Sequence, residues 1–226
     1  MQVTEIYRSI QGESSYAGLP CIFVRLTGCN LRCTWCDSEY TFEGGQRMTL
    51  DEVEDQVRVL APVKLVEITG GEPMLQEKEV LELMSRLLAS GYTILLETSG
   101  ERPLARVPKE VVKVVDVKCP HSGEANTFLM ENLSALTPRD EVKFVLSDRT
   151  DYEFARDFTR THDLPARVGS VIFSPAFRKD AAGTRDASHC LLDPRLLAEW
   201  ILADGLGVRL GLQVHKFIWE PQVKGV

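Results

Sequence analysis

The sequence lacks the features that would place the chain in a membrane or send it out of the cell. No apolar run reaches the ~18 residues that a membrane span needs. Residues 1–5 carry neither the basic stretch nor the apolar run of a signal peptide. Low-complexity segments are also absent, and nothing divides the 226 residues into two units. We therefore expect a single cytoplasmic domain spanning residues 1–226.

Positive charge is scarce. The chain has 26 Lys and Arg against 33 Asp and Glu, which gives a formal net charge of −7. This balance argues against a broad phosphate-binding surface, so we expect no nucleic acid partner. A small, locally basic pocket remains compatible with it. Hydrophobic residues make up 44% and charged residues 26%, the usual balance of a globular domain with its own core.

Cysteine is too sparse for a disulfide framework, because the chain has only six cysteines in 226 residues. Three of them, Cys29, Cys33 and Cys36, stand together in one short segment. Cys21 opens an apolar run, where we expect it to be a small buried hydrophobe. Cys119 and Cys190 are scattered and are weaker candidates for additional ligands.

The segment from Cys29 to Cys36 places three soft thiolate ligands at spacings of four and three residues. Iron–sulfur clusters and other thiolate sites normally use four ligands, so a set of three leaves one coordination position open for a reacting molecule. Trp35 could pack its aromatic face against a flat ligand bound there. A structural zinc loop or three buried thiols remain alternatives, although no nearby His completes a zinc site.

Strand patterns alternate with helix patterns along the chain. Apolar and β-rich runs predict strands over residues 3–9, 21–26, 64–69, 93–97, 111–117, 142–146, 170–173 and 209–214. Helices are predicted from a capping box at residues 49–52 to Pro62, over 75–90, over 128–136, from a second capping box at 150–153 to 161, and from Asp193 onward.

This alternation predicts an α/β fold with right-handed crossovers and a parallel sheet. Active sites on such sheets gather at the carboxyl ends of the strands. Five segments follow predicted strands and are expected to converge there, namely the cysteine loop and residues 70–73, 99–100, 118–120 and 174–175.

The cysteine loop, with an aromatic residue before its last Cys, resembles the cluster loop of the radical S-adenosylmethionine (SAM) superfamily. Gly70-Gly71-Glu72-Pro73, following a strand, resembles the stretch of that superfamily that binds the amino group of SAM, although alone it would be only a turn. The resemblance implies a partial, open TIM-type β/α barrel with parallel strands and helices outside. It also implies a 4Fe-4S cluster on the three cysteines, with SAM on the fourth iron and cleaved to a 5'-deoxyadenosyl radical.

A narrower resemblance, to the 7-carboxy-7-deazaguanine synthase family, covers nearly the whole chain. Its features are Ile10-Gln11-Gly12-Glu13, Arg25, Cys36-Asp37-Ser38, Thr69 to Pro73, Glu97 to Gly100, Asp116-Val117-Lys118 and Gln213-Val214-His215-Lys216. It implies a carbon–nitrogen lyase of deazapurine and queuosine biosynthesis. Such an enzyme converts 6-carboxy-5,6,7,8-tetrahydropterin to 7-carboxy-7-deazaguanine by ring contraction with loss of ammonia.

The same resemblance implies three sets of binding residues and no catalytic side chain, because the radical does the chemistry. The SAM contacts would be Trp35, Asp37, Gly71, Glu72, Asp116, Val117, Lys118, Ser174 and Pro175. The substrate contacts would be Ile10, Gln11, Gly12, Glu13, Arg25, Thr69 and His215. Ser38 would bind Mg²⁺, with helix capping as the alternative.

Arg25 is the one cation in an otherwise apolar strand, and its planar fork suits a substrate carboxylate. A structural ion pair is the alternative for Arg25. The resemblance also implies an external one-electron reductant of the flavodoxin or ferredoxin type and a homodimer. Whether the end of the chain, near Pro221, contacts substrate stays open.

Two other functions remain possible at this stage. A glycyl-radical activating enzyme shares both SAM motifs, but needs a groove for a partner protein instead of a small polar pocket. An iron–sulfur electron carrier or zinc-binding module would be no enzyme at all. Formation of 5'-deoxyadenosine from SAM separates the enzymes from the carrier.

Overall fold

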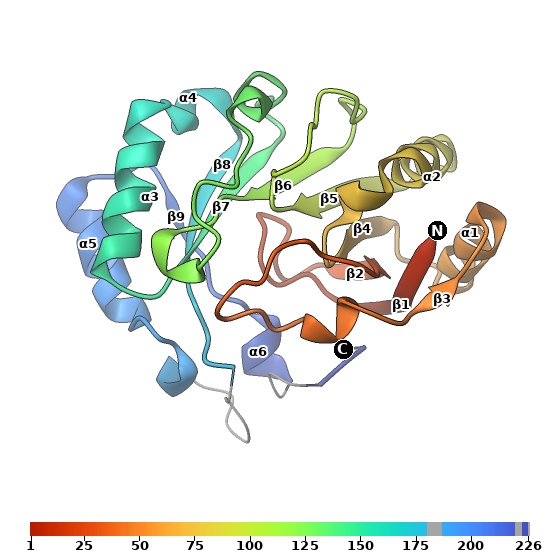
Figure 1. Cartoon of the computed structure of the whole chain (residues 1–226), viewed down its shortest axis with the longest axis horizontal. Helices are drawn as coiled ribbons and strands as arrows, with labels where there is room; N and C mark the ends of the chain where they lie inside the picture. The colour runs from red at the N-terminus through yellow and green to blue at the C-terminus, as the bar shows by residue number, and fades with distance from the viewer. Residues whose placement is uncertain (180–186, 220–222, 226) are drawn as a thin grey trace.

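A curved nine-stranded sheet forms the centre of the computed structural model, which describes residues 1–179, 187–219 and 223–225. The strand order is β3-β1-β2-β4-β5-β6-β7-β8-β9, and within the described chain the edge strands β3 and β9 do not pair with each other, so the barrel is open (Figure 1). The strands are β1 Gln2–Ile10, β2 Pro20–Leu26, β3 Gln46–Arg47, β4 Leu65–Gly70, β5 Thr93–Thr98, β6 Val112–Asp116, β7 Glu141–Leu146, β8 Ser170–Pro175 and β9 Arg209–Leu210.

Neighbouring strands from β2 to β9 are parallel, which confirms the predicted open α/β barrel. The first strand differs, because β1 runs antiparallel to both β2 and β3. The loop from Gln11 to Leu19 explains this difference. It is shorter than the about twelve residues that a parallel crossover needs, so β1 and β2 form a hairpin.

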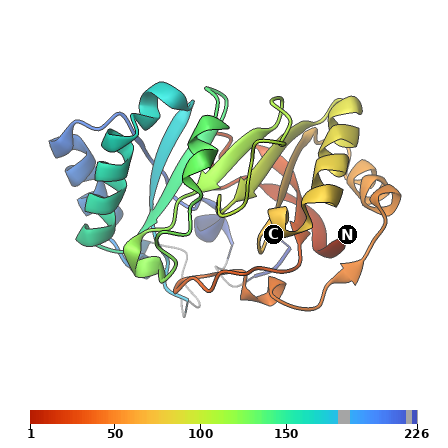
Figure 2. The same ribbon diagram turned by 45° about the horizontal axis from the view of Figure 1, so that its top comes forward.

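Helices cover the outer face of the sheet (Figures 1 and 2). They are α1 Leu50–Val59, α2 Glu77–Ala89, α3 Arg149–Thr161, α4 Leu164–Arg167 and α5 Pro194–Asp204. A further helix, α6 His215–Ile218, lies apart from them near the C-terminus, and short 3-10 helices form at Glu39–Thr41, Pro73–Gln76, Pro120–Ser122, Met130–Ser134 and Ala187–His189. In α2 the buried residues Val80, Leu83, Met84 and Leu87 form one stripe at helical spacing and join the main core. None of the helices in these described ranges is long and apolar enough to cross a bilayer.

The two predicted capping boxes have different outcomes. Thr49 caps α1 as predicted, since its side chain accepts from the backbone of Glu52 and Glu52 reciprocates. The box predicted at Thr150 is wrong. Asp148 caps α3 instead, accepting a 3.0 Å hydrogen bond from the backbone N–H of Asp151. The helix therefore begins at Arg149, and Thr150 lies within its first turn.

The predicted strand over residues 209–214 is also wrong beyond Leu210. The N–H of Gly211 donates to the carbonyl of Phe173, and the chain then leaves the sheet edge. Further on, the N–H of Val214 donates to the carbonyl of Gly12 at 3.0 Å, and α6 follows at once. The end of the chain thus returns to the loop after β1.

The inner face of the sheet is apolar toward the amino ends of its strands and charged toward the carboxyl ends. A cluster of Cys21, Phe23, Leu65, Leu95 and Val112 fills the apolar end. Cys21 is fully buried there, as predicted. Two residues further along their strands, Arg25, Glu67 and Glu97 share that face, because alternate residues point the same way. The register thus directs polar side chains toward the strand ends.

Candidate active site

A cavity of about 270 Å³ opens at the carboxyl ends of the parallel strands. Most residues predicted for the site line it, including Ile10, Gln11, Gly12, Glu13, Arg25, Cys29, Cys33, Trp35, Cys36, Asp37, Ser38, Thr69, Gly71, Asp116, Lys118 and His215. The predicted convergence of the cysteine loop with segments 70–73, 99–100 and 118–120 is therefore present, since Gly70, Gly71, Ser99 and Lys118 also line the cavity, whereas residues 174–175 do not.

Four predicted SAM contacts do not line the cavity. Val117 is 2% exposed and packs in the main core, while Ser174 and Pro175 are buried at the end of β8. Glu72 is 1% exposed, and both its oxygens are occupied. The contact of these four residues with SAM stays a prediction.

Glu72 joins two strand ends. One carboxylate oxygen accepts from the backbone of Met74 and the hydroxyl of Thr98, and the other accepts from the backbone and hydroxyl of Ser99, all at 2.7–3.0 Å. Four donors already satisfy this carboxylate, and its binding of an ammonium group stays a prediction. Its contribution to the site is to hold the Gly70-Gly71 turn in place.

Gly71 allows that turn to lie directly against the cysteine loop. A Cβ at this position would meet the carbonyl oxygen of Gly28 at 2.1 Å and the Cβ of Cys29 at 2.8 Å. The next residue, Glu72, donates its N–H to the same Gly28 carbonyl at 2.8 Å. Only glycine fits such a close approach of two backbones.

The three loop cysteines form no disulfide, are partly exposed and lie close to one another. Burial raises the pKa of the Cys33 thiol to about 11, against the opposing charge of Lys118. Cys21, Cys119 and Cys190 are buried and do not line the cavity. Three thiols that face one open cavity fit a cluster ligated by three cysteines with one position left for a small molecule.

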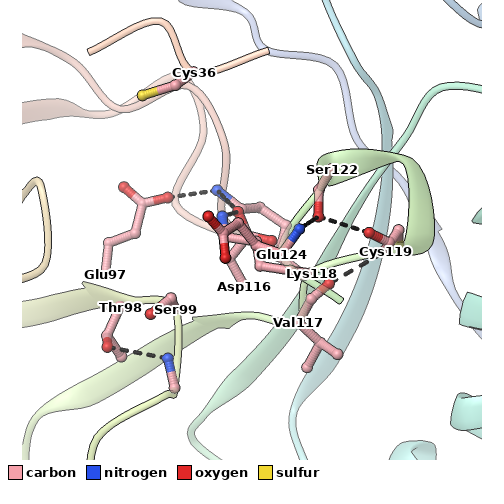
Figure 3. A network of polar contacts seen from close by, with 12 residues as sticks. Cys36, Glu97, Thr98, Ser99, Asp116, Val117, Lys118, Cys119, Ser122 and Glu124 are labelled. Atoms are coloured by element: carbon pink, nitrogen blue, oxygen red, sulfur yellow. Dashed lines mark hydrogen bonds and ion pairs between the residues drawn. The ribbon is translucent and has the colours of Figure 1, made fainter. Parts of the chain in front are cut away.

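Lys118 and Asp116 form an ion pair of 2.9 Å, drawn in Figure 3, and the charges of both act on the thiol of Cys33. Burial would lower the pKa of Lys118, but the charges of Asp116 and Cys33 and the hydrogen bond to Asp116 together raise that pKa. Glu97, from the neighbouring strand β5, points into the same region in Figure 3. The strand ends therefore present both charge signs next to the cluster loop.

Lys143, on β7, joins three elements. Its ammonium contacts Glu13 at 2.6 Å and Glu97, and lies 3.8 Å from Asp116. Burial would raise the pKa of Glu13, but Lys143, His215 and Lys216 together lower it well below its usual value. A side chain that is 2% exposed and makes these contacts is a buried, compensated cation.

The C-terminal residues close one side of the cavity. Gln213 donates to Glu13 at 2.8 Å, and Lys216 pairs with Asp37 at 2.6 Å. His215 lies so close to Gly12 that a Cβ there would meet its Nδ1 at 2.5 Å. Burial lowers the pKa of His215, which favours the neutral form of its imidazole. Pro221 lies outside the described residues.

Arg25 has a partner within the protein. Its Nε pairs with Glu5 at 3.0 Å and its Nη2 donates to the hydroxyl of Tyr7 at 2.8 Å. The structural ion pair considered as an alternative is therefore present, while the side chain still lines the cavity. Tyr40 also donates to Glu5, which fixes the carboxylate that orients the guanidinium.

Ser38 precedes a 3-10 helix, but its side chain makes no capping hydrogen bond. Its hydroxyl lies 3.7 Å from the sulfur of Cys36 and lines the cavity. A hydroxyl in this place fits a hard cation that also binds water and substrate. Nearby Glu13, Asp37 and His215 each bring a ligand atom within 4.8 Å of the others, yet Lys143 and Lys216 already occupy the two carboxylates.

Sequence reasoning missed Glu67 and Lys143, which line the cavity but belong to no motif used above. Both are charged residues within predicted buried strands, the signal that singled out Arg25. A search for charged residues in every predicted apolar strand would have found Glu67 and Lys143. Glu97, Gln213 and Lys216 were part of the family motifs and also line the cavity, although they were not expected to bind a ligand.

Comparison with known proteins agrees with this geometry. The sequence model of the radical SAM superfamily matches residues 23–119. The chain is 71% identical to 7-carboxy-7-deazaguanine synthase of Koribacter versatilis over the full length of both chains. It belongs to the 7-carboxy-7-deazaguanine synthase family. The family member from Chlorobaculum tepidum is 43% identical and covers 100% of this chain and 97% of its own.

Solved structures agree with this membership in the 7-carboxy-7-deazaguanine synthase family. The crystal structure of QueE from Escherichia coli superposes with a TM-score of 0.70 at 25% identity, covering 93% of this chain and 92% of that one. SuiB of Streptococcus suis, at 11% identity and a TM-score of 0.56, shares the fold over 84% of this chain and 47% of its own. The chain is thus a radical SAM enzyme of this family.

Proposed function

We propose that this enzyme converts 6-carboxy-5,6,7,8-tetrahydropterin to 7-carboxy-7-deazaguanine with release of ammonia, as a step of queuosine biosynthesis. One observation carries the proposal. The three cysteines line the same cavity as Arg25, Glu13 and His215, so the place where a radical would be generated and the place where a small polar substrate would bind are continuous. The side chain of Arg25 is 17% exposed, so it is open to a ligand.

Cys29, Cys33 and Cys36 would hold the 4Fe-4S cluster. Trp35, Gly71 and Lys118 line the cavity next to it and are the best placed contacts for SAM. When the cluster and SAM are both bound, they supply a 5'-deoxyadenosyl radical. The residues of this chain then have to bind the substrate, exclude water and hold the reacting carbon close to the radical.

Substrate recognition falls to the polar lining away from the cysteines. Arg25 offers a fixed positive charge to the pterin carboxylate, and Thr69 and neutral His215 offer hydrogen bonds to the ring edges. Glu13 and Gln11 shape the wall that the loop after β1 supplies. Ser38 would hold a Mg²⁺ ion that orients the substrate.

The remaining parts of the proposal concern partners. An external one-electron donor of the flavodoxin or ferredoxin type would reduce the cluster, and the enzyme would act as a homodimer. The cavity favours a small substrate over the docking groove that a glycyl-radical activating enzyme would need, because it is lined by closely spaced charged side chains.

The test is product formation by the reconstituted enzyme. With SAM, a chemical reductant and the carboxy-tetrahydropterin, mass spectrometry should detect 7-carboxy-7-deazaguanine, and ammonia should be released with it. Cys33→Ala should make neither that product nor 5'-deoxyadenosine, whereas Cys190→Ala, at a buried cysteine outside the cavity, should make both. Formation of 5'-deoxyadenosine without any deazapurine would contradict the proposed substrate.

A further inference from the structure

Glu67 is a buried carboxyl group for which family membership supplies no role. It lies on β4 at the floor of the cavity and is 2% exposed. Its neighbours in the strand register are Phe23 on β2 and Leu95 on β5, and Leu65 precedes it on the same face. Three of its sides are thus apolar. Moving an ionised carboxylate into such a place costs several kcal/mol unless a cation compensates it.

No cation pairs with Glu67 among the described residues. The titratable groups that face it are Cys21, Tyr7, Glu13 and Glu97, from β2, β1, the loop after β1 and β5. None of these brings positive charge. Burial raises the pKa of Glu67 well above its usual value, and the negative charge of Glu97 raises it further.

Glu97 has the partners that Glu67 lacks. One of its oxygens contacts the ammonium of Lys143, and the other accepts a 3.1 Å hydrogen bond from the hydroxyl of Thr69. Of two neighbouring carboxyl groups, the one beside the cation keeps its charge and the one in apolar surroundings keeps the proton. The two carboxyl groups are close enough for the charge of Glu97 to act on Glu67.

We infer that Glu67 is held as a neutral carboxylic acid that donates its proton to Glu97 and accepts from Gln11, and that it thereby positions both of these cavity-lining groups. The Gln11 amide donates to Glu67 at 3.0 Å, while its oxygen accepts from the backbone N–H groups of Glu13 and Ser14. Glu67 is therefore the inner end of a chain of hydrogen bonds that fixes the loop after β1. It is a positioning residue.

The neutral state also matters for charge. If the proposed function holds, the cavity must accept a substrate carboxylate and the carboxylate of SAM. Glu13, Glu97 and Asp116 already share Lys143 and Lys118. A further negative charge at Glu67 would oppose anionic ligands in a low-dielectric site. This functional consequence rests on the proposed function, whereas the protonation state does not.

Infrared spectroscopy of the cluster-loaded enzyme tests the protonation state directly. The enzyme at neutral pH should show the carbonyl stretch of a protonated carboxylic acid, and Glu67→Gln should remove that band. Glu141→Gln is the matched control, since Glu141 is another buried glutamate and accepts from the backbone and hydroxyl of Ser15. The band should persist in that control. Its absence from the unsubstituted enzyme would overturn the inference.

Kinetics test the positioning role. Glu67→Leu fills the space without hydrogen bonds and should lower kcat/KM for the pterin at least about tenfold, because Gln11 and Glu97 lose their common partner. Glu67→Gln keeps a neutral donor and acceptor and should restore kcat/KM to within about threefold of the unsubstituted enzyme. Equal activity of both variants, or equal loss in both, would overturn the positioning role. If even the unsubstituted enzyme forms no deazapurine, the proposed function fails, while the infrared result still decides the protonation of Glu67.

Discussion

At the scale of single residues, the site consists of buried charges that compensate one another. Lys143 contacts carboxylates from the loop after β1 and from β5, and Lys118 pairs with Asp116 from β6. Removing one partner of such a buried pair typically costs about 3–5 kcal/mol, because the other charge is left uncompensated. The network therefore ties the strand ends to one another and holds the cavity open in a fixed shape.

A substitution of Arg25 can show whether this residue binds the substrate carboxylate or only forms a structural ion pair. Arg25→Ala should lower kcat/KM for the pterin by about one to two powers of ten, since a charge-assisted bond to a carboxylate is worth about 1.5–3 kcal/mol. Slow SAM cleavage without pterin should change far less. Arg25→Lys should rescue poorly, because lysine lacks the planar fork. Steady-state assays of both reactions provide the measurement.

Glu5→Gln is the control for the ion pair. It weakens the contact that orients Arg25 without removing the guanidinium, so it should have a smaller effect than Arg25→Ala. If Arg25→Ala depressed both reactions by the same factor, Arg25 would be a structural residue and not a substrate contact.

Ser38 gives the corresponding prediction for the metal. Mg²⁺ should raise turnover of the pterin, and Ser38→Ala should weaken that response, because the hydroxyl is the protein oxygen proposed to bind the ion. Titration of turnover with Mg²⁺ for both proteins measures the effect. An unchanged magnesium dependence in Ser38→Ala would place the ion elsewhere.

The sequence was most informative where residues act through a local motif. The three cysteines, Gly71 and His215 lie at the cavity because each belongs to a segment that directly follows a strand or returns to one. For Glu72, the local motif alone does not show which groups its carboxylate contacts. Its carboxylate is occupied by Thr98 and Ser99, which become its neighbours only through the pairing of β4 with β5.

At the scale of secondary-structure elements, local signals predicted types better than boundaries. The strands and outer helices follow the apolar periodicity, but Asp148 and not Thr150 begins α3. Both residues are acceptable caps by type. The choice depends on Asp151, which is fully buried and accepts from Ser147 and His121, so the helix start is fixed by contacts outside the helix.

The helix starts can be tested with one substitution each. Thr49→Ala and Asp148→Ala should each lower the free energy of unfolding by about 1 kcal/mol, because each removes an N-terminal cap. Thr150→Ala is the matched control and should stay within about 0.5 kcal/mol of the original protein, as is usual for a surface position without a cap. Urea denaturation followed by circular dichroism measures all three. A loss in Thr150→Ala equal to that in Asp148→Ala would contradict the observed cap.

At the scale of the whole molecule, the open barrel brings together groups that are far apart in sequence. Glu13 from the start of the chain contacts both Lys143 and Gln213. Two features make these contacts possible. The β1–β2 hairpin places the loop after β1 at the cavity, and the C-terminal segment returns from β9 to that loop. The prediction of a strand over residues 209–214 missed this return, because apolar alternation in the sequence carries no information about where the sheet ends.

The central claim is that the radical forms and reacts in this one cavity. The most direct measurement uses carboxy-tetrahydropterin deuterated at its ring carbon positions, followed by mass spectrometry of the 5'-deoxyadenosine produced. The account predicts that 5'-deoxyadenosine gains deuterium from the pterin while 7-carboxy-7-deazaguanine forms. Unlabelled 5'-deoxyadenosine, produced at the same rate with and without the pterin, would contradict it.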